Sequence, residues 1–177
     1  MAFKTNTVPH IGEILFVDPG VPDLVTILGS LRPGVEAIVL DRARPASRQI
    51  GTALADRDVD TVHVIAHGAP GRVSFAAGTW SAETIDDEAA DFAAIGAALG
   101  VGGELRLWSC DTGADTAGAL FVERLAQATG VDIATAPGRV GAAALGGGWN
   151  LTSHPHLAPS QPPLTAAGGE PVSDVLD

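Results

Sequence analysis

The sequence predicts an α/β fold, in which a mostly parallel sheet lies between layers of helices as a three-layer α/β/α sandwich. Short apolar segments alternate along the chain with longer segments whose apolar residues recur at helical spacing. Strands that alternate with helices form βαβ units with right-handed crossovers and parallel strands. The 177-residue chain is 46% hydrophobic, which suits one domain with a sizeable core.

Five short apolar segments are expected to form the sheet, in a strand order of about 2-1-3-4-5. They cover residues 11–17, 35–40, 61–66, 105–109 and 131–134. A hairpin is expected over residues 72–80, with its turn near Ala77-Gly78. A glycine-rich turn precedes Trp149-Asn150-Leu151, which is expected to form an edge strand.

Four helices are expected to connect these strands. They cover residues 21–31, 46–57, 81–99 and 113–129. Pro45 precedes the second helix, and Gly130 follows the last one, where glycine favours the end of a helix.

Residues 10–152 are predicted to form the α/β domain, and residues 153–177 a tail. The tail holds five of the twelve prolines in the chain and shows no apolar periodicity. Such a segment buries little apolar surface, so we expect it to be mobile.

The charge and hydropathy of the chain disfavour two classes of partner. The formal net charge is −11, whereas nucleic-acid binding needs a basic surface. No apolar run approaches the ~18 residues needed to span a membrane. The N-terminus shows no basic segment followed by an apolar one, so we expect a cytoplasmic protein, with export by another route left open.

Cys110 is the only cysteine and ends an apolar strand. Asp111 and Thr112 follow it, and either residue can cap the helix expected from residue 113. A thiol at a helix N-terminus is stabilised as the nucleophilic thiolate. The alternative is a small buried apolar residue, which is what most free cysteines are.

His67 and Gly68 end another apolar strand. In a parallel sheet this places His67 and Cys110 at the same carboxyl edge, where ligands bind. A thiol and an imidazole are the minimal parts of a cysteine nucleophile and its base. The backbone N–H groups of Gly68 and Cys110 are candidates for an oxyanion site. The alternative is a histidine that merely precedes a turn.

Asp18 ends the first strand, which the expected strand order places beside His67. Its carboxylate is a candidate to orient the imidazole or to bind a basic substrate side chain. The alternative is turn formation, since Asp-Pro-Gly is a turn sequence in its own right.

His63 lies four residues before His67, and a zinc site could use His63, His67 and Cys110. No carboxylate or cysteine pair has ligand spacing, so we expect no metal and no cofactor. A structural role, or support for His67, is the expectation for His63. Trp108 is expected in the core or in the wall of a pocket.

Taken together, these segments resemble a bacterial domain of unknown function that often occurs within giant repeat-containing surface proteins. That domain belongs with the caspase-like cysteine peptidases, which include gingipains, clostripain, separase and the CHAT domains. The resemblance covers residues 13–152 and rests on the order and spacing of several short segments. They are Phe16-Val17-Asp18, Val21-Pro22-Asp23, Val39-Leu40-Asp41, Gln49-Ile50, 63–71, Ser109-Cys110-Asp111, 125–130 and 145–151.

The resemblance implies a catalytic pair of His67 and Cys110, with the oxyanion bound by Gly68 and Cys110. It also maps the pocket for the residue before the scissile bond onto Asp18 and the stretch that starts at Thr135. Asp18 then favours Arg or Lys in the substrate, and Asp111 is a second candidate for that role. The chain departs from the family in having Ser109, where glycine usually precedes the cysteine.

The sequence therefore predicts a cysteine peptidase that acts on a peptide or protein substrate, after a basic residue. Two other functions stay open. One is a binding or scaffold module that keeps the fold without catalysis, and the other is a peptide-maturing acyltransferase or ligase that uses the same cysteine.

Overall fold

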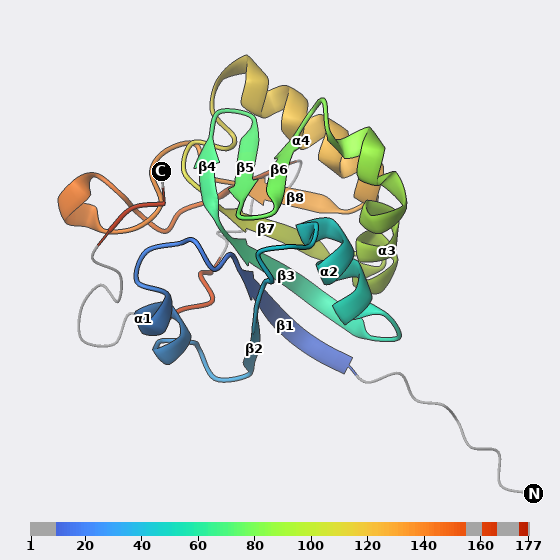
Figure 1. Cartoon of the computed structure of the whole chain (residues 1–177), viewed down its shortest axis with the longest axis horizontal. Helices are drawn as coiled ribbons and strands as arrows, with labels where there is room; N and C mark the ends of the chain where they lie inside the picture. The colour runs from blue at the N-terminus through green and yellow to red at the C-terminus, as the bar shows by residue number, and fades with distance from the viewer. Residues whose placement is uncertain (1–9, 155–160, 166–173, 177) are drawn as a thin grey trace, which may run out of the picture.

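A six-stranded sheet organises the protein, as seen in a computed structural model that describes residues 10–154, 161–165 and 174–176 (Figure 1). The strand order is β2-β1-β3-β7-β8-β9, and every pair is parallel except β8 with β9. The first five strands confirm the predicted order. The strands are β1 (His10–Val17), β2 (Val35–Val39), β3 (Asp58–Ile65), β7 (Glu104–Trp108), β8 (Asp132–Thr135) and β9 (Thr152–His154).

In the described part of the chain, three helices cover one face of the sheet and one short helix lies on the other (Figure 1). On the first face, Ile50, Phe92 and Phe121 from α2, α3 and α4 join one buried cluster with alternate residues of the central strands. On the second face, Ile27 of α1 joins a cluster that contains Trp108 and Cys110. The helices are α1 (Leu24–Gly29), α2 (Ala46–Leu54), α3 (Ala89–Leu99) and α4 (Asp115–Thr129).

A small antiparallel sheet stands at the carboxyl end of β3. It consists of β4 (His67–Ala69), β5 (Arg72–Phe75) and β6 (Gly78–Ser81), in the order β4-β5-β6. The predicted hairpin corresponds to β5 and β6. Strand β4 was not predicted, and it adds the histidine motif to the edge of this hairpin.

All four helices are shorter than predicted, and α2 ends at Leu54 instead of residue 57. Helix α1 begins only at Leu24 because Asp23 has a left-handed backbone, with φ of 57°. The segment before α3 is partly the 3₁₀ helix η1 (Ile85–Glu88). Helix α4 begins at Asp115, after a turn closed by the Ala114 N–H on the Asp111 carbonyl, and ends at Thr129, with Gly130 capping it as predicted.

The edge strand also differs from the prediction. The sheet is completed by β9, at residues 152–154, and not by Trp149-Asn150-Leu151. Residues 149–151 do not join the ladder. The residue before them, Gly148, bridges to Val140, and the 3₁₀ helix η2 (Ala143–Leu145) lies between these two residues in the chain.

The predicted mobile tail is wrong for two described segments. Leu164 bridges to Leu31 and is buried against the α1 face of the sheet. Leu176 is completely buried in the same cluster. Both segments therefore help to cover the face that α1 alone leaves open, while the rest of the predicted tail beyond β9 lies outside the described residues.

Candidate functional site

The parallel register of β3 and β7 brings the two predicted motifs together. Ile65 of β3 pairs with Trp108 of β7, so His67 and Cys110 each lie two residues beyond a paired position. A Cβ built on Gly68 would lie only 2.5 Å from the Cys110 carbonyl oxygen and 2.7 Å from the Ser109 Cβ. The backbone after His67 therefore packs directly against the backbone of the cysteine motif, with space only for glycine.

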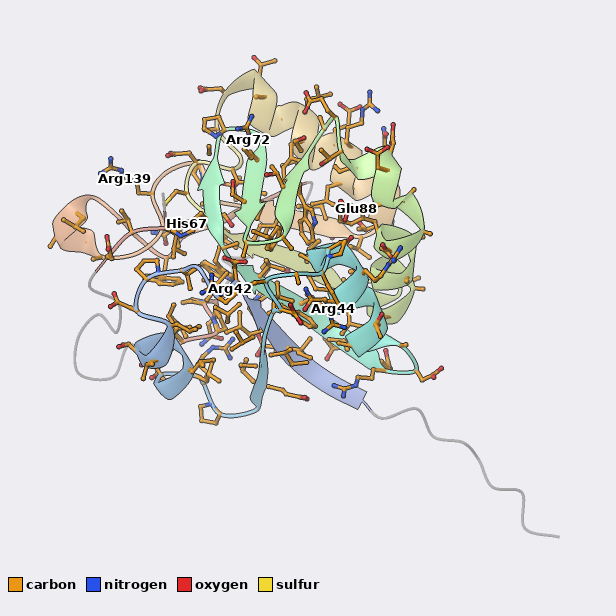
Figure 2. The ribbon with its side chains drawn as sticks, in the orientation of Figure 1. Arg42, Arg44, His67, Arg72, Glu88 and Arg139 are labelled. Carbon is orange, nitrogen blue, oxygen red and sulfur yellow. The ribbon has the colours of Figure 1, made fainter. Side chains whose placement is uncertain are left out.

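The imidazole of His67 is held by a backbone carbonyl. Its Nε2 lies 3.0 Å from the oxygen of Gly20, in the loop after β1. A carbonyl only accepts, so Nε2 carries the proton in this arrangement and Nδ1 is the nitrogen with a lone pair. Figure 2 shows His67 at the start of β4, between the labelled Arg42 and Arg139 in this view.

Asp18 does not orient the imidazole directly. Its carboxylate is buried and accepts two backbone N–H groups, from Gly20 at 3.0 Å and from Ala76 at 2.8 Å. Asp18 thus holds the N–H of Gly20, and the carbonyl of Gly20 in turn accepts from His67. This arrangement corrects the expectation of a carboxylate open to a basic substrate side chain, because both oxygens are turned to backbone donors.

Cys110 is completely buried, and its sulfur contacts the backbone of Val140. The Val140 N–H donates to Sγ at 3.2 Å, and the Val140 oxygen lies 3.6 Å from the same sulfur. The sulfur therefore accepts from the N–H and donates to the carbonyl of the same residue, which fixes its position. The expected helix N-terminus is not there: α4 begins five residues later, with Ala114 as its N-cap and no side-chain cap from Asp111 or Thr112.

The N–H of Gly68 is already engaged by a carbonyl. It donates to the oxygen of Leu176 at 3.0 Å, and the Leu176 N–H donates to Val140 at 3.0 Å. Sequence reasoning missed this contact because it assigned residues 153–177 to a mobile tail. The signal that could have found it is the apolar pair Val175-Leu176 within a polar and proline-rich stretch.

The loop after Cys110 is tied to the small antiparallel sheet. The Thr112 hydroxyl donates to the Arg72 carbonyl at 3.1 Å, and the Gly71 N–H donates to the Thr112 carbonyl at 3.1 Å. The Asp111 N–H donates to the Gly138 carbonyl at 2.9 Å, and its side chain is half-buried. These bonds fix β4, and with it His67, relative to the cysteine loop.

A family model described as a domain of unknown function, DUF4347, matches residues 14–169. The chain belongs to this family. Comparison with curated proteins and with solved structures gives no match. The site built from Gly20, His67, Gly68 and Cys110 lies within the matched DUF4347 region, whereas Leu176 lies beyond it.

His63 serves a polar network under the DUF4347 sheet and does not contact the sulfur. Its Nε2 lies 2.8 Å from a carboxylate oxygen of Glu13, and the Trp108 indole N–H donates to its Nδ1 at 3.0 Å. Arg32 binds the same carboxylate through two hydrogen bonds, of 3.0 and 2.8 Å. With Nδ1 accepting, the buried imidazole is neutral and donates from Nε2.

Two pKa values reflect this network. Burial lowers the pKa of His63, although the hydrogen bond to Glu13 acts in the opposite direction. The hydrogen bond from His63, helped by Arg32, lowers the pKa of Glu13 to about 2 against the effect of burial. The network thus holds a charged carboxylate and a neutral imidazole at neutral pH.

Of the remaining predicted residues, Trp108 lies beside Cys110, and Thr135 lies in a separate groove. Trp108 is completely buried in the cluster that holds Cys110, and its ring centroid is 5.7 Å from that of Trp149. Thr135 faces a groove of about 750 Å³ between α4 and β8, which contains Gly113 but neither His67 nor Cys110. Within the described ranges, no three His, Cys, Asp or Glu side chains cluster as metal ligands, and no helix is long and apolar enough to cross a membrane.

Proposed function

We propose that this DUF4347 domain is a cysteine peptidase, with Cys110 as the nucleophile and His67 as its proton-transfer partner. The observation that carries the proposal is the packing of Gly68 on the Cys110 backbone, which joins the two motifs into one site. A cysteine that only fills space in the core would not need the His67–Gly68 loop packed against its backbone. The hydrogen bond that His67 donates to the Gly20 carbonyl adds the group that orients the imidazole.

In the proposed reaction the Cys110 thiolate attacks the carbonyl carbon of a peptide bond. The developing oxyanion is bound by the N–H of Gly68 and the N–H of Cys110, a pair of fixed dipoles of the kind worth about 10²–10³ in rate per donor. His67 first takes the proton of the Cys110 thiol at Nδ1, since Nε2 already carries the proton that Gly20 accepts, and then delivers it from Nδ1 to the leaving amine. Water then hydrolyses the thioester and regenerates the thiol.

One observation favours a non-catalytic binding module as the second candidate. The Cys110 side chain has no exposed surface, and the Gly68 N–H is occupied by Leu176. For catalysis, a substrate must displace Leu176 from the Gly68 N–H, or residues 174–176 must themselves be the substrate. Reactivity of the thiol in the folded protein therefore separates the two functions.

The test is alkylation by peptidyl chloromethyl ketones, read by intact mass, beside hydrolysis of a peptide library. A peptidase is expected to be labelled once, at Cys110, and to lose both labelling and hydrolysis in Cys110→Ala and His67→Ala. Thr52→Ala, on the exposed side of α2, is the matched control and is expected to keep the parent rate. Hydrolysis that survives Cys110→Ala, or a folded protein that neither alkylates nor cleaves, contradicts the proposal and favours the binding module.

A further inference from the structure

The carbonyl of Leu176 lies where the proposed reaction needs a substrate carbonyl. Its oxygen accepts the N–H of Gly68 at 3.0 Å, the same donor assigned to the oxyanion. In an acyl transfer the carbonyl oxygen becomes the oxyanion, so the residue that supplies it directly precedes the scissile bond. Leu176 thus occupies the position of that residue.

The segment before Leu176 lies in the manner of a bound peptide. Residues 174–176 pair with residues 140–142: the Leu176 N–H donates to Val140 at 3.0 Å, and the Ala142 N–H donates to Asp174 at 2.9 Å. Val175 forms an antiparallel bridge with Gly141. Main-chain pairing of this kind holds an extended peptide regardless of its sequence and leaves specificity to side-chain pockets.

The groove is built to receive a backbone at close range. A Cβ on Gly141 would overlap the Asp174 carbonyl oxygen and lie 2.8 Å from the Val175 Cα. Gly141 also has φ of 129°, which disfavours any other residue. On the other side of the segment, the Val140 N–H donates to the Cys110 sulfur while the Val140 carbonyl accepts from Leu176. One residue therefore connects the nucleophile to the bound segment.

The side chain of Leu176 defines the chemistry of the pocket. It is completely buried in an apolar cluster with Trp108, Val140 and Cys110. The Asp18 carboxylate, which was expected to bind a basic side chain, instead accepts two backbone N–H groups. A branched aliphatic side chain is stabilised there, whereas a buried guanidinium would lack a partner at Asp18.

We propose that residues 174–176 bind as the acyl side of a substrate, and that Cys110 cleaves the Leu176–Asp177 bond and other peptides with leucine at that position. This inference rests on the proposed peptidase function and replaces the expected preference for a basic residue. Sulfur forms a thioester with the Leu176 carbonyl carbon, and the C–N bond to Asp177 breaks. His67 protonates the departing amine, and water hydrolyses the thioester to a Leu176 carboxylate and free thiol.

The experiment measures the intact mass of the full chain during incubation at neutral pH. The parent is expected to lose whatever follows Leu176, and Cys110→Ala is expected to stay whole. Leu176→Arg is expected to slow this cleavage at least about 100-fold, because the cluster gives the guanidinium no partner. Thr52→Ala, on the exposed side of α2, is the control expected to keep the parent rate.

A second measurement separates this inference from the proposed function. Fluorogenic peptides ending in Asp-Val-Leu and in Asp-Val-Arg are compared on the cleaved parent, with at least an about 100-fold preference for leucine expected from the apolar pocket. If added peptides are cleaved after arginine while the 176–177 bond stays intact, this inference is overturned but the proposed peptidase function stands. Turnover of added peptide that rises in Leu176→Arg, while the parent stays whole, shows an inhibitory segment and also overturns it. An inert Cys110 in both measurements overturns both.

Discussion

The imidazole of His67 is bound by the carbonyl of Gly20, 3.0 Å from Nε2, and not by a carboxylate. The carboxylate that sequence reasoning placed there, Asp18, acts one step further away by holding the Gly20 N–H. A carbonyl orients a histidine without adding charge beside it. The proton-transfer geometry of the site therefore depends on how firmly the loop after β1 is fixed.

Asp18→Asn is expected to reduce kcat by up to about 100-fold, because a small misplacement of a proton donor is enough to cause such a loss. An asparagine accepts from only one of Gly20 and Ala76 and turns its amide towards the other N–H. As Asp18 is a positioning residue, kcat should fall while KM changes little, which steady-state kinetics on a cleaved peptide will show. Asp41→Asn, after the neighbouring strand β2 and exposed, is the control. An equal loss in both variants would contradict the role given to Asp18.

Gly68→Ala is expected to lower peptide hydrolysis by more than about 100-fold, since it disturbs both the oxyanion donor and the histidine loop. The new Cβ would lie 2.5 Å from the Cys110 oxygen and 2.7 Å from the Thr112 hydroxyl. The backbone must move to relieve this overlap, at a cost to stability of about 1–3 kcal/mol. Parallel chemical unfolding and kinetics measure both effects. Gly12→Ala, where a Cβ meets nothing within 4 Å, should change neither.

Stability is expected to fall as the pH drops below about 6.5, because His63 is buried as the neutral imidazole. Its pKa is lowered in the folded state, so the unfolded chain binds the proton first and is favoured in acid. Glu13 adds a second loss below pH 4.5, which extends to about pH 2, since its folded pKa is about 2. Urea unfolding between pH 8 and pH 5 isolates the histidine contribution.

His63→Gln is the matched variant for this pH dependence. Glutamine can accept from the Trp108 indole and donate to Glu13, but it does not titrate in this range. The variant is expected to be nearly flat between pH 8 and pH 5 where the parent declines. A parent-like decline in His63→Gln would assign the acid sensitivity to another group.

The sheet and the meeting of the two motifs could be predicted from sequence because both depend on local patterns. Apolar runs mark the strands, and the register of β3 with β7 follows once they are neighbours. The groups that complete the site could not be found in this way. Gly20 and Leu176 contribute backbone carbonyls, which every residue carries, and they lie 47 and 108 positions from their partners His67 and Gly68. No side-chain chemistry marks such residues, and only the folded chain selects them.

Asp18 shows the converse limit, where side-chain chemistry alone misleads. A carboxylate beside a histidine at a sheet edge suggests catalysis or substrate binding. The turn residues Gly20 and Ala76 instead supply two N–H groups that need an acceptor, and the buried carboxylate satisfies both. Its location was predicted correctly, but its partners depend on where the β5–β6 turn folds back.

Thr112→Val tests whether the clamp between the cysteine loop and the histidine sheet matters for catalysis. The Thr112 hydroxyl donates to the Arg72 carbonyl at 3.1 Å from a completely buried position, and valine has nearly the same shape without the donor. Loss of this hydrogen bond should cost about 1 kcal/mol of stability. Because β4 carries His67 and pairs with β5, a loosened clamp should also lower kcat, by about 10-fold if His67 shifts by a fraction of an ångström. Thr52→Val on the exposed face of α2 gives the background effect of the same substitution. Full activity in Thr112→Val, with the stability loss alone, would show that the sheet position of His67 is set by the Gly20 and Gly68 contacts without the clamp.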